Sequence, residues 1–187
     1  KHDISILENL RRFYYGLTVT NFKTVMGNLF LISTPIGNLE DISIRAIKVI
    51  RNTKYLLCED TRRTGQLLKK LDINTEHLFI SYYDQTEFKK IPQVIKLLTQ
   101  NNVVLISDAG TPLISDPGYK LVSECVRRKI KVISIPGASA VLTSLLTSGL
   151  PPNNFWFIGY MPDKEVAKEK LFAELLAKIS NFKINSL

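Results

Sequence analysis

Short apolar runs alternate with segments of helical periodicity along most of this chain, and the alternation constrains the fold more than any other feature. The apolar runs, which we predict to be strands, span residues 29–33, 55–58, 77–81, 103–107 and 131–135. The helical segments that follow them span residues 44–51, 62–71, 89–100, 119–128 and 138–147. Repeated strand–helix units pack into a mostly parallel sheet, and continuously apolar strands are typical of a sheet covered on both faces. We therefore predict an α/β fold with a mostly parallel five-stranded sheet and flanking helices.

The strongest break in this pattern is Gly149-Leu150-Pro151-Pro152. Two consecutive prolines cannot continue a helix, so we place the end of a first α/β domain, residues 26–150, at this point. Residues 151–187 then begin a second α/β domain. Residues 1–25 carry only a weak helical pattern ahead of the clean start of the fold, and we interpret them as an N-terminal extension.

The second domain is predicted to contain only two elements. A strand is expected at 155–158, and Asp163 is placed to cap a helix. The apolar face of that helix consists of Phe172, Leu175, Leu176 and Ile179. One strand and one amphipathic helix cannot bury themselves alone, so we expect this domain to be incomplete.

Charge and the few metal-binding side chains narrow the classes of function. The 187 residues carry a net charge of +8, which favours anionic partners such as nucleic acid, although a lysine-rich proteome would explain it equally well. Cys58 and Cys125 are predicted to be buried structural thiols. Neither they nor His2 and His77 have the spacing of metal ligands, so no metal is expected. No apolar run is long enough to span a bilayer and no secretion signal is evident, so we predict a cytoplasmic protein without a membrane partner.

Residues that could bind a ligand cluster at the carboxyl ends of predicted strands, where α/β sheets collect their ligands. The candidates are Pro35 and Gly37 after the first strand, Asp108, Gly110, Thr111 and Leu113 after the fourth, and Pro136, Gly137, Ser139 and Ala140 after the fifth. Asp108 can accept hydrogen bonds from ribose hydroxyls or an ammonium group, and the helix after the fifth strand leaves amides free for a carboxylate. Turn geometry and helix capping are the alternative reasons for these residues.

The second and third strands end in groups with two possible roles. Glu59-Asp60-Thr61-Arg62-Arg63 could position a nucleophile or hold a phosphate, or it could be a helix cap with its ion pairs. Tyr82-Tyr83 could be a stacking wall for a base or an edge of the core. The residue pattern alone leaves both questions open.

Six motifs occur together in a characteristic order. They span residues 34–41, 59–62, 107–118, 136–140, 148–151 and 157–162, and the third reads Ser-Asp-Ala-Gly-Thr-Pro-Leu-Ile-Ser-Asp-Pro-Gly. As a set they resemble the tetrapyrrole-methylase superfamily, in its branch that methylates a ribose 2′-hydroxyl of small-subunit ribosomal RNA. The resemblance runs from Gly27 to about Ile179.

The resemblance implies a two-domain α/β enzyme, usually a homodimer, that binds S-adenosylmethionine between its domains. The residues implied to contact the cofactor are Pro35, Asp108, Thr111, Leu113, Pro136, Ser139 and Ala140, with Gly37, Gly110 and Gly137 leaving room for it. Glu59, Asp60 and Arg62 would face the methyl group and the substrate, and Glu59 or Asp60 would be the general base. The implied reaction methylates the 2′-hydroxyl of a cytidine ribose in 16S ribosomal RNA, within the small ribosomal subunit.

Two other interpretations stay open. A methylase acting on a corrin precursor would share the cofactor site, although the motif at 107–118 favours the RNA branch. A non-catalytic remnant that binds RNA or cofactor is favoured by the incomplete second domain. For the same reason we expect this chain by itself to be a poor methyltransferase, because a cofactor cleft with one wall cannot hold the reacting atoms in line.

Overall fold

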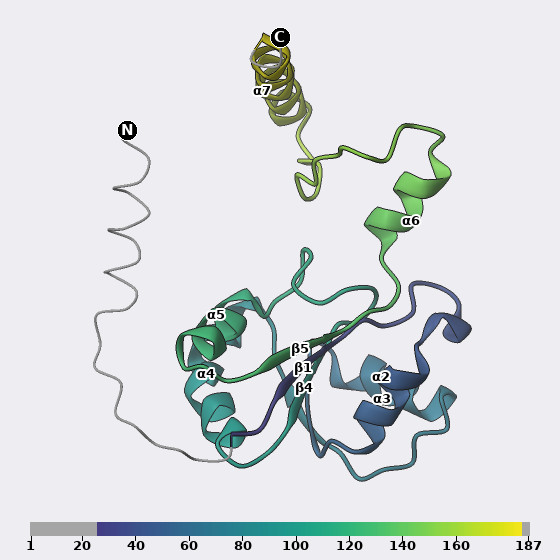
Figure 1. Ribbon diagram of the computed structural model, residues 1–187, viewed down its shortest axis with the longest axis vertical. Helices are drawn as coiled ribbons and strands as arrows, with labels where there is room; N and C mark the ends of the chain where they lie inside the picture. The colour runs from purple at the N-terminus through teal and green to yellow at the C-terminus, as the bar shows by residue number, and fades with distance from the viewer. Residues whose placement is uncertain (1–25, 185–187) are drawn as a thin grey trace. The chain divides into compact units, whose positions relative to one another are not determined.

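The computed structural model describes residues 26–184; the predicted N-terminal extension, residues 1–25, lies outside them. The predicted sheet is confirmed. Its strands are β1 (Leu29–Ile32), β2 (Tyr55–Cys58), β3 (Leu78–Ser81), β4 (Val103–Ile106) and β5 (Val132–Ile135). They lie in the order β3-β2-β4-β1-β5, and every neighbouring pair is parallel. Figure 1 labels β4, β1 and β5, which lie side by side in this order. At one edge, β3 pairs with β2 alone among the described residues, and its Leu78 and Phe79 are exposed.

Helices follow the strands in the predicted alternation. They are α2 (Ile44–Arg51), α3 (Thr61–Lys70), α4 (Asp84–Leu98), α5 (Tyr119–Arg127), α6 (Ala140–Thr147) and α7 (Glu165–Ile184), with the short 3-10 helix η1 at Leu39–Asp41. Helix α4 begins five residues before the predicted start, because the hydroxyl of Thr86 accepts a hydrogen bond from the Tyr83 amide and fixes an earlier first turn. Among residues 26–184, no helix is both long enough and apolar enough to cross a bilayer.

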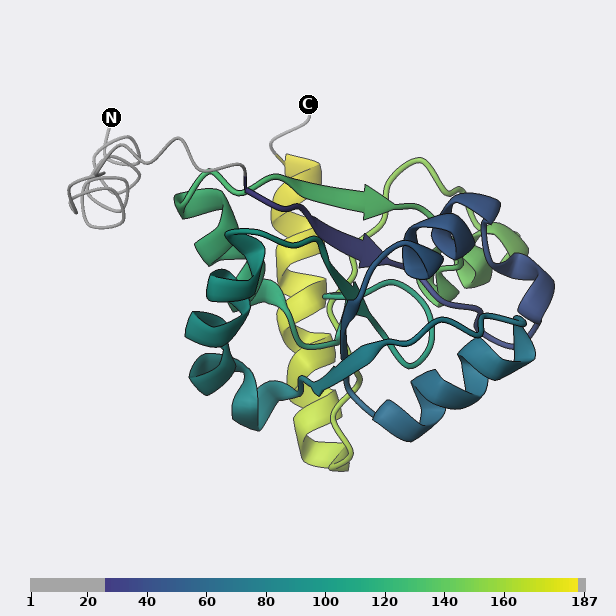
Figure 2. The same ribbon diagram turned by 90° about the horizontal axis from the view of Figure 1, so that it is seen from below.

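The helices cover both faces of the sheet and create two cores. Helices α2 and α3 lie on one face, and α4 and α5 lie on the other (Figures 1 and 2). Leu56 and Ile106 belong to the core on the α2–α3 side, whereas Leu57 and Leu105 belong to the core on the α4–α5 side. Successive strand residues therefore enter different cores, which explains why the strands are continuously apolar.

Both cysteines are buried in these cores as free thiols, as predicted. Cys58 lies in the core beside α2 and α3, and Cys125 lies in the core beside α4 and α5. Burial raises the pKa of Cys58 to about 11 and that of Cys125 to about 12. The thiolate is the nucleophilic form, so burial disfavours the reactive state of both side chains.

The order of the strands fixes where a ligand can collect. Strands β1 and β4 lie side by side, but β1 leads to α2 on one face and β4 leads to α5 on the other. Loops that leave neighbouring strands towards opposite faces open a crevice at the carboxyl edge of the sheet. The loops that carry most of the predicted cofactor residues begin at this point.

The chain divides into two compact units between Asn153 and Asn154. In the second unit, the predicted strand at 155–158 is wrong: these residues form no strand. A strand needs a partner for its backbone groups, and this extended segment has no ladder within the described residues. Asp163 was also predicted wrongly as a helix cap. Helix α7 begins at Glu165, and the carbonyl of Lys164 accepts its first hydrogen bonds.

Residues of the predicted apolar face of α7 are largely open to solvent. Phe172 is 50% exposed and Leu176 is 65% exposed, while Leu175 is half-buried. The side chain of Ile179 lies outside the described part of the chain. Within the second unit, then, one helix buries little of its apolar surface.

Gly118, the residue before α5, is expected to be intolerant of any side chain. Its φ is +127°, and a β-carbon there would lie 2.5 Å from Cδ2 of the buried Leu105. Gly118→Ala should lower the free energy of unfolding by about 1–3 kcal/mol because the backbone is strained, as measured by urea denaturation. Gly65→Ala is the matched control: Gly65 lies inside α3 with open space around it, so alanine should be neutral or stabilising. Equal losses in the two variants would contradict this account.

Candidate functional site

Two backbone hydrogen bonds tie the loop after β1 to the loop after β4. The amide of Thr34 donates to the carbonyl of Gly110 at 2.9 Å, and the amide of Gly110 donates back to Thr34 at 3.1 Å. Two buried hydroxyls reinforce this bridge, because Thr34 donates to the Ser107 carbonyl at 3.2 Å and Ser107 donates to the Gly110 carbonyl at 2.7 Å. Gly110, with φ +84°, is thus held as part of a short extension of the sheet.

The loop after β5 joins them through one side chain. The hydroxyl of Thr111 accepts a hydrogen bond from Ser33 at 3.3 Å and donates to the carbonyl of Ala138 at 3.1 Å. Gly137 is needed for close approach, because a β-carbon there would lie 2.9 Å from Cβ of Ser33. Thr111 and Gly137, predicted from the resemblance as cofactor residues, therefore also have a structural role in joining the three loops.

The remaining predicted cofactor residues are distributed over the same three loops. Ser139 caps α6, since its hydroxyl accepts from the Leu142 amide at 3.5 Å, and Ala140 begins that helix. Pro136 is exposed, Pro35 is half-buried, and Gly37 has open space around it.

Leu113 lies in the middle of the loop after β4, residues 107–118, which we call the β4 loop. Its backbone is strained, and its side chain packs against the core. Its φ is +72°, a left-handed conformation that is uncommon for leucine, and Ser115 two residues later has φ +64°. The half-buried side chain of Leu113 packs against the core beside α4 and α5. The strained backbone of this loop therefore depends on contacts with the rest of the protein, because residues 113 and 115 would otherwise adopt more favourable backbone angles.

Asp108 connects the β4 loop to the loop after β2. Its carboxylate accepts the amide of Asp60 at 3.3 Å and pairs with the guanidinium of Arg63 at 3.3 Å. Asp108, Glu59, Asp60 and Arg62 line one open pocket of about 600 Å³, together with Thr61, Arg63, Ser81 and Tyr83. The structure therefore brings the three predicted catalytic residues to Asp108. Pro35 and Ser139 do not line this pocket.

Asp60 takes the capping role that the sequence left open. Its carboxylate accepts the amides of Arg62 at 2.8 Å and Arg63 at 3.4 Å, and it also pairs with the Arg62 guanidinium at 3.0 Å. These bonds to Arg62 hold the pKa of Asp60 at about 2. A carboxylate so strongly stabilised as an anion is a poor proton acceptor near neutral pH.

Glu59 has the opposite electrostatic character. Burial raises its pKa above the ordinary value, and the neighbouring carboxylates Asp108 and Asp84 raise it further, against a smaller lowering by Arg63. The side chain is nevertheless exposed to the open pocket. Of the two candidate bases, Glu59 is the one whose surroundings favour proton uptake.

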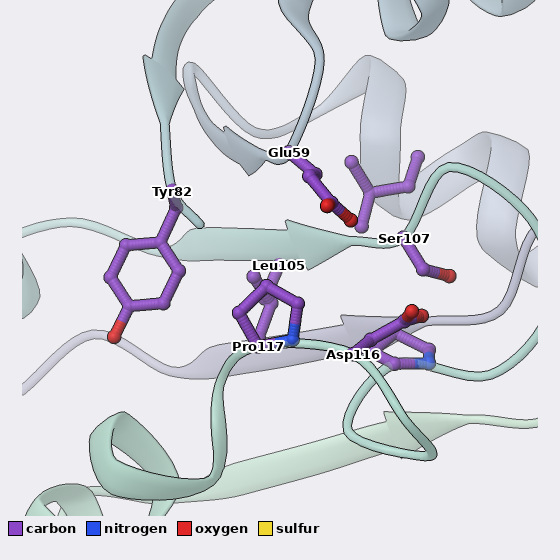
Figure 3. A pocket seen from close by; sticks show the side chains of 8 residues that line it. Glu59, Tyr82, Leu105, Ser107, Asp116 and Pro117 are labelled. Carbon is purple, nitrogen blue, oxygen red and sulfur yellow. The ribbon is translucent and has the colours of Figure 1, made fainter. Parts of the chain in front are cut away.

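A second, narrow pocket of about 10 Å³ lies beside the open one, and Asp116 contributes to it. Figure 3 shows the side chains of Glu59 and Asp116 lining this pocket around the end of β4. Burial, together with Glu59 and Asp108, raises the pKa of Asp116 from 3.8 to about 6. Asp116 lies within the family-like motif but has no signal of its own in the sequence.

Glu87, whose carboxylate is buried, is not among the residues predicted from the sequence. It accepts the amides of Gly118 and Lys120 at 3.1 Å each and the hydroxyl of Tyr82 at 3.3 Å. One signal could have found it, because Glu87 falls on the apolar stripe of α4 that continues through Ile91 and Val94. Tyr82 is therefore a core residue, whereas Tyr83 lines the open pocket.

Comparison with known proteins places the chain in a family. The sequence profile of the family described as Tetrapyrrole (Corrin/Porphyrin) Methylases matches residues 28–181. The match covers most of the chain, so the protein belongs to the tetrapyrrole methylase family.

Within that family, the chain is similar to proteins named ribosomal RNA small subunit methyltransferase I. The one from Hydrogenobaculum sp. (strain Y04AAS1) is 45% identical over 150 residues, covering 80% of this chain and 64% of the relative. The one from Rickettsia prowazekii (strain Madrid E) is 46% identical over 149 residues, covering 79% of this chain and 52% of the relative. The chain thus spans about half to two thirds of the length of these relatives.

A solved structure shares the fold at lower similarity. Uroporphyrin-III-C-methyltransferase from Thermus thermophilus matches 67% of this chain and 54% of its own, with a TM-score of 0.50 and 19% identity. At that identity the match supports the α/β fold and nothing finer.

The raised pKa of Asp116 predicts a specific dependence of stability on pH. Its pKa of about 6 in the folded protein exceeds the ordinary value of 3.8, so the folded protein binds a proton that the unfolded chain has already released. The contribution of Asp116 to the free energy of unfolding is therefore fully present below about pH 4 and is lost as pH rises through 6. Asp116→Asn should flatten this slope and raise the free energy of unfolding at pH 7 by about 1–3 kcal/mol. Urea denaturation from pH 2 to 8 measures it.

Asp60→Asn is the control, because the pKa of Asp60 is lowered to about 2 and its effect on stability therefore has the opposite dependence on pH. Its contribution is present above pH 4 and is lost as pH falls towards 2. An Asp116→Asn variant that keeps the wild-type slope between pH 4 and 6 would refute the assignment.

Proposed function

We propose that this chain binds S-adenosylmethionine and takes part in transferring its methyl group to the 2′-hydroxyl of a cytidine ribose in 16S ribosomal RNA. One observation carries the proposal: Glu59, Asp60 and Arg62 share an open pocket with Asp108, at the sheet edge where three loops are tied together. Side chains that could act on a ribose hydroxyl thus share a pocket with Asp108, which could bind the cofactor. The name of the relatives supports the ribosomal substrate.

The residues at this edge fit S-adenosylmethionine in charge and in hydrogen-bonding capacity. Glu59, Asp108 and Asp116 interact electrostatically with one another, and a concentration of carboxylates favours a sulfonium cation. Asp108 can accept ribose hydroxyls or an ammonium group, and the first turn of α6 after Ser139 offers amides to a carboxylate. When bound, the cofactor would supply a methyl group already activated for transfer.

The protein's own residues would then prepare the acceptor hydroxyl. Glu59 accepts its proton, because a raised pKa brings a carboxylate closer to the pH at which it works. Asp60 keeps the first turn of α3 in place. Arg62, with a side chain 86% exposed, can bind phosphates of the RNA backbone, and Arg63 also orients Asp108.

The ribosomal partner and the place in the cell follow from this substrate, and the homodimer follows from the family resemblance, as further expectations. The RNA would be met within the small ribosomal subunit, in the cytoplasm, and the enzyme would act as a homodimer. A methylase of corrin precursors would share the cofactor residues, and a non-catalytic binding protein would share them without transferring the methyl group. Transfer assays with each acceptor separate the three functions.

Asp108→Ala should weaken cofactor binding more than folding. Titration calorimetry with S-adenosylhomocysteine should show a loss of affinity of about 10- to 100-fold, the worth of a charge-assisted hydrogen bond. Glu76→Ala is the control, because Glu76 is exposed and lies just before β3, at the amino ends of the strands, whereas the site lies at their carboxyl ends. Unchanged affinity in Asp108→Ala would rule out its role.

Glu59→Gln should impair methyl transfer without impairing cofactor binding. With labelled S-adenosylmethionine and small subunits that lack the modification, we expect a rate about 10²- to 10⁴-fold below wild type, the usual contribution of a general base. Asp60→Asn should retain most activity, because asparagine also caps helices well. Cofactor binding by wild type without transfer to RNA or to a corrin precursor would favour the non-catalytic alternative.

A further inference from the structure

The β4 loop, residues 107–118, is the longest connection at the candidate site, and its two ends are held by different groups. At its start, Ser107 and Gly110 are fixed by the bridge to Thr34. At its end, the amide of Gly118 is held by the carboxylate of Glu87, which comes from another element, α4. Between these anchors lie Leu113 and Ser115 in left-handed conformations.

Glu87 is buried to an unusual degree for a carboxylate. The residue is 3% exposed, and one oxygen, Oε1, accepts all three of its hydrogen bonds, from Gly118, Lys120 and Tyr82. Its other oxygen lies 3.8 Å from the ammonium group of Lys120. Helix α5 has no side-chain cap of its own, because Gly118 occupies its N-cap position. Oε1 of Glu87 therefore accepts the free amides at the amino end of α5 from a neighbouring helix.

We propose that Glu87 is a positioning residue for cofactor binding, which holds the β4 loop in its binding shape through the amides of Gly118 and Lys120. The proposal rests on the proposed function, since it concerns the same cofactor. Glu87 is separated from the open pocket, which it does not line, and acts through the loop that carries Asp108, Gly110 and Leu113. Its removal releases the end of the loop, so cofactor must then order the loop as it binds.

The test compares two substitutions at this position. Glu87→Gln keeps an oxygen that can accept the three hydrogen bonds, whereas Glu87→Leu has a similar volume and no acceptor. Leu98→Ala is the control for stability, because Leu98 is fully buried at the other end of α4 and supplies no hydrogen bond to Gly118 or Lys120. All variants are studied as the whole chain, at a temperature where circular dichroism shows each of them folded.

Titration with S-adenosylhomocysteine gives the first measurement. We expect Glu87→Leu to lose about tenfold or more in affinity and Glu87→Gln to stay within about threefold of wild type. Leu98→Ala should bind as wild type does, although it is less stable. Wild-type affinity in Glu87→Leu, or an equal loss in Leu98→Ala, would overturn the proposal, because the effect would then be absent or would follow stability alone.

Hydrogen–deuterium exchange of the free protein gives the second. The amides of Gly118 and Lys120 should exchange faster in Glu87→Leu than in Leu98→Ala, and close to wild type in Glu87→Gln. Failure of wild type to bind S-adenosylhomocysteine would refute the proposed function and, with it, the role of Glu87 in binding. Binding by wild type with unchanged exchange and affinity in Glu87→Leu would refute the positioning role alone.

Discussion

The pairing of β1 with β4 at the centre of the sheet is the constraint on which the candidate site depends. Their four-residue ladder is fixed at both ends. Before the ladder, the side-chain oxygen of Asn102 accepts hydrogen bonds from the backbone amide and the side-chain amide of Asn28. After the ladder, Thr34 and Gly110 exchange two backbone hydrogen bonds. Side chains alternate between the two cores, so a slip of one residue would move Leu105 and Ile106 each into the wrong core. A fixed register therefore determines where the β1 and β4 loops leave the sheet, and with them the site.

Neighbouring carboxylates at the end of β2 show how local geometry divides chemical roles. Asp60 is turned to the amino end of α3, where amides and a guanidinium stabilise its charge. Glu59, one residue earlier, has its pKa raised by burial and by two neighbouring carboxylates, Asp108 in the β4 loop and Asp84 at the start of α4. Pairs of carboxylates with pKa values driven apart are a recurring feature of sites that move protons. Here the start of a helix separates the two environments within a single peptide unit.

The sequence predicted the sheet and the clustering of loops well, because continuous apolar runs and strand-end motifs depend on local chemistry. It could not predict contacts between distant segments, such as Arg63 with Asp108 or Glu87 with Gly118, since no spacing rule links them. The family resemblance pointed to Thr111 for the cofactor, but its bonds to Ser33 and Ala138 emerge only from the fold. The predicted strand at 155–158 failed for the converse reason: its composition suits a strand, but a strand also needs a neighbour.

The edge strand β3 has a consequence for the protein in a crowded cell. Within residues 26–184 its outer side has no partner strand, and only the Ser81 carbonyl is occupied there, by the Lys90 ammonium group. Leu78 and Phe79 are exposed on the same strand, and such features invite another chain to add a strand and begin an aggregate. However, β3 is only four residues long, so an intruding strand could form few hydrogen bonds with it. Its shortness protects the protein from aggregation, and an insertion that lengthened this strand would remove that protection.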